Sequence, residues 1–129
     1  MLAKASPVQG VEHVLLRDAL GRTLARDVAA LRSQPPFASS AMDGYAVRAL
    51  DLAGLAELHV AGESAAGRPY DGELGPMQAI RIFTGAVVPE GADTILMQEN
   101  AVGSGPGRVR PLVQEKRGRH VRALSLIHI

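Results

Sequence analysis

Cysteine and tryptophan are absent from this chain, and aromatic residues make up only 3% of its 129 residues. The absence of cysteine excludes disulfides, thiolate metal sites and a cysteine nucleophile. Because aromatic side chains are scarce, the hydrophobic core has to be built from Val, Leu, Ile, Ala and Met. An excess of one charge is also lacking, since the net charge is +1. The sequence therefore gives no electrostatic case for binding nucleic acid or a membrane surface.

Long apolar runs are missing as well. No run approaches the roughly 20 residues that a helix needs to span a bilayer. Residues 1–10 also lack the apolar stretch of a signal peptide. We therefore expect a cytoplasmic protein with neither membrane nor nucleic-acid partners. Hydrophobic residues make up 47% of the chain, which is enough for the folded core of one domain or of two small ones.

The first quarter of the chain predicts a short strand followed by a helix. Residues 11–16 carry several apolar side chains and predict the strand. Apolar residues recur at helical spacing over residues 19–28 and predict the helix, with Asp18 as its N-cap. The two prolines in residues 33–36 can neither continue a helix nor donate to a β-ladder, so we place a domain boundary there.

Beyond this boundary the sequence predicts a mainly β domain. A helical turn is expected through Asp51, and Gly and Pro turns are frequent. The predicted strands cover residues 43–47, 57–61, 79–83, 94–98 and 109–113. We therefore expect a mainly β fold of the α+β class, with a β-rich domain over residues 35–122 and a partial strand–helix stalk or linker over residues 1–34.

The last residues differ from the polar, basic stretch before them. Residues 124–129 read Leu-Ser-Leu-Ile-His-Ile, which looks like translated adapter or vector sequence. We predict that residues 123–129 form a tail outside the natural coding sequence.

Asp43 is the first candidate for chemistry. It lies in PFASSAMDGYAV (residues 36–47), after two serines and before Gly44. A carboxylate in such a loop can hold a cation or orient a water molecule, because the glycine permits close backbone approach and the hydroxyls satisfy backbone groups. The structural alternative is an Asx-turn that opens a strand.

Thr84 is the second candidate and lies in RIFTGAVVPEGAD (residues 81–93). A threonine hydroxyl and the amides that follow it at a strand end can bind an oxyanion such as phosphate. The structural alternative is an ordinary turn at the end of a strand. The segment Pro-Glu-Gly-Ala-Asp at residues 89–93 is interpreted mostly as a turn that sets the next strand.

Other charged residues are less specific. Arg68 and Arg81 can each attract an anion or lie along apolar side chains at the surface. Glu99 is either functional or a solvated carboxylate at a strand end, and the basic residues 116–122 are interpreted as a solvated face. The four histidines show no spacing typical of a metal site.

Three ordered segments together resemble the molybdopterin molybdenumtransferase family, whose eukaryotic members include the gephyrin E domain. They are GRTLARDV (residues 21–28), PFASSAMDGYAV and RIFTGAVVPEGAD. The resemblance runs from about Met1 to about Arg122. It implies a β-rich domain of short, bifurcated and coiled sheets beside part of a dimerising stalk.

The resemblance also implies a function. Family members insert molybdate into adenylylated molybdopterin with a divalent cation, and they are homodimers roughly three times longer than this chain. Their nucleotide site lies mainly in a later α/β domain, so this chain alone is expected to be an inactive N-terminal fragment. We expect Mg²⁺ as cofactor, with Asp43 as its ligand, and molybdate as substrate. The expected catalytic residues are Asp43 and Thr84, and the expected substrate- or anion-binding residues are Ser40, Gly44, Arg81 and Gly85.

Two alternatives stay open at this point. The first is a non-catalytic binding or assembly module with the same fold, and the second is a generic β-rich domain with chance similarity. The shared-cleft interpretation requires the Asp43 and Thr84 side chains to lie on one open face of the folded domain.

Overall fold

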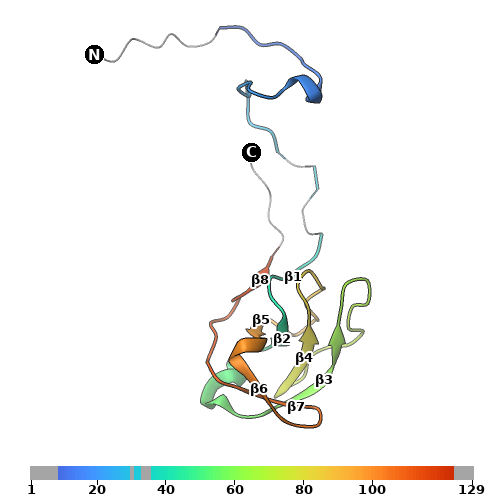
Figure 1. Cartoon of the computed structure of the whole chain (residues 1–129), viewed down its shortest axis with the longest axis vertical. Helices are drawn as coiled ribbons and strands as arrows, with labels where there is room; N and C mark the ends of the chain where they lie inside the picture. Colours follow the sequence, from blue (N-terminus) through green and yellow to red (C-terminus); the bar gives the residue numbers. More distant parts are fainter. Residues whose placement is uncertain (1–8, 30, 33–35, 124–129) are drawn as a thin grey trace, which may run out of the picture.

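The structure is a computed structural model that describes residues 9–29, 31–32 and 36–123 (Figure 1). All of its named strands lie between residues 39 and 122. They form one β-rich body, while residues 9–29, the N-terminal segment, run apart from it in Figure 1. The elements in chain order are η1 (Leu16–Asp18), β1 (Ser39–Ser40), β2 (Gly44–Val47), η2 (Ala49–Leu55), β3 (Leu58–Ser64), β4 (Gln78–Ile82), β5 (Thr94–Met97), η3 (Gln98–Asn100), β6 (Ala101–Gly105), β7 (Arg108–Pro111) and β8 (Val121–Arg122), where η marks a 3₁₀ helix.

Six strands make one curled sheet in the order β5-β2-β4-β3-β7-β6 (Figure 1). The pair β3–β4 is parallel, and the other pairs of the sheet are antiparallel. The remaining strands β1 and β8 form a separate antiparallel ribbon, which joins the beginning and the end of the body. The mainly β fold predicted from the sequence is thus confirmed.

Both faces of the curled sheet carry a hydrophobic core, because side chains of one strand point alternately to opposite faces. Ile80 and Ile82 of β4 face one core, whereas Ala79 faces the other. The first core contains Ala46, Leu74, Ile80, Ile82, Ala86 and Ile95. The second core contains Val47, Leu52, Leu58, Ala79, Leu96 and Val109. Each core is aliphatic, as the scarcity of aromatic residues required.

Gly44 marks the closest backbone approach within the sheet. It lies between Ile82 of β4 and Met97 of β5. A Cβ atom at this position would lie 2.0 Å from the carbonyl oxygen of Leu96, so only glycine fits the spacing of these strands.

The predicted strand over residues 11–16 and helix over residues 19–28 are wrong. The N-terminal segment is irregular apart from η1, and Leu16 and Leu20 are 91% and 97% exposed. Short helices are marginal without packing of their apolar face, and these two leucines are almost fully exposed in the described part of the chain. Helical spacing alone therefore did not make a helix here.

Other sequence predictions are only partly covered by the structure. The predicted boundary falls mostly on residues 33–35, and the predicted tail falls mostly on residues 124–129. Both segments lie outside the described residues, so these assignments stay predictions. Within the described part of the chain, no helix is long and apolar enough to cross a membrane.

Candidate functional site

The site is centred on Asp43 and Thr84, which the sheet brings together. Asp43 immediately precedes β2, and Thr84 follows the end of β4. The antiparallel register places Gly44 opposite Ile82, so the two loops leave the sheet at the same edge. The Asp43 Oδ1 atom accepts hydrogen bonds from the backbone N–H and the hydroxyl of Thr84, each at 2.8 Å, across 41 residues of sequence. The condition that both side chains share one open face is met.

The Asp43 carboxylate is held in its charged form. The Thr84 backbone N–H, then the Thr84 hydroxyl and the positive charge of Arg81, lower the pKa of Asp43 below its ordinary value, against a smaller opposing effect of burial. Among the described residues, no hydrogen bond or ion pair engages Oδ2. This second oxygen is the atom of the pair that can bind a cation or orient a water molecule.

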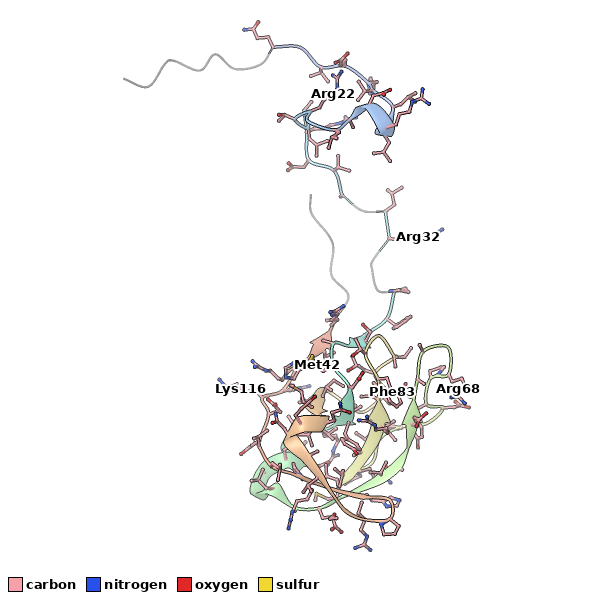
Figure 2. All side chains as sticks on the ribbon, in the orientation of Figure 1. Arg22, Arg32, Met42, Arg68, Phe83 and Lys116 are labelled. Carbon is pink, nitrogen blue, oxygen red and sulfur yellow. The ribbon has the colours of Figure 1, made fainter. Side chains whose placement is uncertain are left out.

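Ser40 connects the loop before β2 to the loop after β4 through hydrogen bonds. Its side chain is fully buried, and its hydroxyl donates to the Met42 carbonyl and accepts from the Met42 N–H. Its backbone N–H donates to the Ala86 carbonyl at 3.0 Å, and its carbonyl accepts from the Gly85 N–H at 2.8 Å. In Figure 2, Met42 and Phe83 lie at the end of the body where β1 and β8 meet.

These contacts bear on the anion-binding roles expected for three residues, which stay predictions. Ser40 and Gly44 are buried, and the Gly85 amide is engaged by the Ser40 carbonyl. Thr84 likewise directs both of its donors at Asp43. An anion could reach these donors only by breaking internal hydrogen bonds. As folded, Ser40, Gly44 and Gly85 belong to the framework of the site.

Arg81 is half-buried beside this framework. Its Nη1 donates to the Gly44 carbonyl at 2.9 Å, and its Nη2 donates to the Gln98 side-chain oxygen at 2.8 Å. The guanidinium carbon lies 5.2 Å from the ring centre of Tyr45 and 4.8 Å from that of Phe83. Arg81 therefore contacts residues adjacent to both Asp43 and Thr84.

Gln98 belongs to the site but was not predicted, because no local pattern marks it. Its backbone N–H donates to the Asp43 carbonyl at 3.1 Å, and its side chain accepts from Arg81.

The remaining charged residues that the sequence suggested, Arg68 and Glu99, are not part of the site. Arg68 is exposed beside a turn of the β3–β4 loop, and its backbone forms hydrogen bonds with that of Ala65 (Figure 2). Glu99 is exposed in η3.

Asp93, at the end of the second motif, has a structural role. Its Oδ1 accepts from the Ala49 N–H and from the Thr94 hydroxyl, each at 2.8 Å. The Ala49 contact holds the first residue of η2 against the loop that precedes β5. The interpretation of residues 89–93 as a structural turn agrees with these contacts.

The donor set at Asp43 fits only part of a metal site. Within the ranges that the structure describes, no group of three or more His, Cys, Asp or Glu side chains is arranged to hold a metal ion. Mg²⁺ is commonly bound through one or two carboxylates together with waters and substrate phosphates. The Oδ2 atom of Asp43 fits the role of one such ligand.

A hollow of about 590 Å³ lies elsewhere, within the N-terminal segment. Its lining includes Val11, Val14 and Leu24, and neither Asp43 nor Thr84 contributes to it. Glu12 and Arg22, which also line the hollow, pair with each other, and none of the residues predicted as catalytic or substrate-binding lies there, so we do not place the chemistry in it.

Comparison with known proteins settles the family. A family model described as the MoeA N-terminal region (domain I and II) matches residues 1–124. The chain belongs to this family. Its match includes all three segments that carried the resemblance.

Named MoeA relatives extend the comparison. The chain is 39% identical to the molybdopterin molybdenumtransferase of Haemophilus influenzae, covering 88% of this chain and 28% of the relative. It is 41% identical to that of a Nostoc species, covering 95% of this chain and 29% of the relative. A crystal structure of the molybdopterin biosynthesis moeA protein from Pyrococcus horikoshii matches with a TM-score of 0.73 and 35% identity, covering 88% of this chain and 31% of that one. The chain thus spans less than a third of the length of these relatives.

Proposed function

We propose that this chain supplies one wall of the active site of a molybdopterin molybdenumtransferase, which inserts molybdate into adenylylated molybdopterin. The observation that carries the proposal is the direct pairing of Asp43 and Thr84, at the surface of a chain that belongs to the MoeA family. The matched relatives that carry the name molybdopterin molybdenumtransferase support the reaction class.

The chemistry places a clear demand on such a site. Molybdate is a dianion, and it has to approach a dithiolene phosphate that is also anionic. A site can offset this repulsion with groups fixed in place before the reaction. A Mg²⁺ ion bound at Asp43 would supply positive charge for both anions.

The residues of this chain have distinct parts in the proposal. Thr84 holds Asp43 through Oδ1, which keeps the carboxylate charged and leaves Oδ2 for a ligand. Asp43 is then the group that binds the cation or orients a water molecule, and Thr84 keeps it in that orientation. The donors that contact the nucleotide and the pterin would come from parts of the longer relatives that this chain does not match, so we expect no activity from these 129 residues alone.

The proposal includes a cytoplasmic, homodimeric parent enzyme. Support for an interface between copies comes from the N-terminal segment, where Leu16, Leu20 and Leu24 are 91%, 97% and 57% exposed. Exposed apolar clusters of this kind are typical of surfaces that are covered in an assembly.

A chimera tests the function. Residues 1–124 of this chain would replace the matching region of the Haemophilus influenzae relative, in cells that lack their own transferase. We expect restored activity of a host enzyme that needs the molybdenum cofactor. Asp43→Ala is expected to lower this activity about 100-fold, and Thr84→Ala about tenfold, because preorganised charge is lost.

The control is Asp71→Ala, which removes an exposed carboxylate from the loop between β3 and β4. It should retain the activity of the unmodified chimera. Full activity of the Asp43→Ala chimera would remove the catalytic assignment, and would favour a binding or assembly module with the same fold.

A further inference from the structure

Arg81 has more contacts with the framework of the site than an anion-binding arginine needs. Both of its terminal nitrogens are committed within the chain, one to the Gly44 carbonyl and one to the Gln98 side chain. Its planar face is used as well, because the guanidinium carbon lies within about 6 Å of the rings of Tyr45 and Phe83. An incoming anion would have to compete with these partners.

Each partner of Arg81 is next to the Asp43–Thr84 pair in the chain or in space. Gly44 follows Asp43, and Phe83 precedes Thr84. Gln98 donates its backbone N–H to the Asp43 carbonyl at 3.1 Å. One side chain thus connects the loop before β2, the loop after β4 and the start of η3.

We propose that Arg81 and Gln98 are positioning residues, which hold the two loops at the separation that lets Thr84 bond to Asp43. This assignment replaces the anion-binding role that the sequence suggested for Arg81. The inference rests on the proposed function, because the Asp43–Thr84 pair matters for catalysis only if the family's reaction takes place at this site.

The geometry depends on the shape of the guanidinium as well as on its charge. A planar group with separate donors can bond to two acceptors in different directions while its face packs on aromatic rings. A lysine ammonium keeps the positive charge but lacks the planar arrangement of N–H donors. Arg81→Lys therefore separates the contribution of geometry from that of charge, and Arg81→Gln removes both.

Amide hydrogen exchange of the ¹⁵N-labelled 129-residue chain measures the effect directly. The Thr84 and Gln98 amides both donate to Asp43, so they report on the site. The Ile95 amide of the edge strand β5 donates to the Arg119 carbonyl and serves as a reporter outside the contacts of Arg81. A residue that positions the site locally should change the first two rates and spare the third.

We expect the Thr84 amide to exchange about tenfold faster in Arg81→Lys and in Arg81→Gln, as expected for the loss of one hydrogen bond's stabilisation. A smaller acceleration is expected in Gln98→Ala, which keeps the backbone N–H. The matched control Arg68→Gln removes an exposed arginine of the β3–β4 loop and should leave all three rates unchanged.

Three results would overturn the inference. An unchanged Thr84 rate in both Arg81 variants shows that Arg81 does not position the pair. A wild-type Thr84 rate in Arg81→Lys, beside a faster rate in Arg81→Gln, overturns the argument that the hydrogen bonds and ring contacts of the guanidinium position the pair, because charge then suffices. Equal acceleration of exchange at Thr84 and Ile95 shows a merely general effect on stability. If Arg81→Gln does not fold, the Thr84 rates of Arg81→Lys and Gln98→Ala decide whether Arg81 and Gln98 position the pair. None of these rates depends on turnover, so their failure is distinguishable from failure of the chimera.

Discussion

Asp51 provides the strongest test of how the β-rich body is held together away from the Asp43 site. Its carboxylate is buried and accepts two hydrogen bonds from Arg48, from Nε and Nη2, each at 2.8 Å. A third hydrogen bond, at 3.0 Å, comes from the backbone N–H of Met77, just before β4. Asp51 therefore links η2 to the strand that carries the Thr84 loop at its other end.

The expected cost of removing Asp51 follows from these contacts. A hydrogen bond to a charged group contributes about 1.5–3 kcal/mol. The two bonds from Arg48 have to be discounted, because 25% of the Arg48 side chain is exposed and solvent screens the pair. We expect Asp51→Ala to lower the free energy of unfolding by about 2–4 kcal/mol. In a body of this size the midpoint of thermal unfolding would fall by about 10 °C or more.

Urea unfolding of the wild type and of Asp51→Ala measures this difference at pH 7. Glu57→Ala is the matched control, because Glu57 also forms an ion pair but at the exposed surface, with Arg108 at 2.9 Å. The control should change stability very little. A loss below about 0.5 kcal/mol in Asp51→Ala would refute the argument that this buried carboxylate stabilises the body.

The same variant has a predictable pH dependence. The hydrogen bonds from Arg48 first, and then the Met77 N–H and the Arg48 charge, lower the pKa of Asp51, while burial opposes them. Because the folded-state pKa is the lower one, the contribution of Asp51 is present above about pH 4. It is lost as the pH falls from there toward the folded-state pKa. Over this acid range the wild type should lose more stability than Asp51→Ala does, and equal losses would contradict the assignment.

Two further predictions concern the sheet edge at the site. Gly44→Ala should destabilise the body by at least about 2 kcal/mol, because its Cβ would lie 2.0 Å from the Leu96 carbonyl oxygen. Gly103→Ala is the control and should be tolerated, because no atom lies within 4 Å of its Cβ. Equal urea midpoints for the two variants would be evidence against this packing. Thr84→Val should raise the pKa of Asp43 in a ¹³C NMR titration, because the side-chain hydrogen bond that lowers it is lost, while Thr84→Ser should preserve it. An unchanged pKa in Thr84→Val would mean that the hydroxyl contributes nothing.

Local sequence patterns predicted five of the six strands of the sheet and missed β6. The segments over residues 79–83 and 94–98 were expected as strands, and the structure has β4 at Gln78–Ile82 and β5 at Thr94–Met97. They were predictable because alternating side chains and nearby turn residues act over a few positions. The ribbon of β1 and β8 was not predictable, since its two strands have two residues each and lie at opposite ends of the body.

The N-terminal segment shows the opposite case. Apolar residues recur at helical spacing over residues 19–28, yet Leu20 is 97% exposed and no helix forms there. An amphipathic pattern gains its stability when the apolar face is buried against another element. Tertiary packing, which the pattern cannot supply, decides whether such a helix exists.

For the site, the sequence by itself determined the residue types: a carboxylate before a glycine at Asp43, and a hydroxyl before a glycine at Thr84. It also carried the family resemblance that the comparison with known proteins established. Only the tertiary structure decided which groups meet. The antiparallel register of β2 and β4 joins residues 41 positions apart, buries Ser40 and engages the Gly85 amide. Hydrogen-bond partners of this kind depend on how distant strands align, and no local pattern specifies that alignment.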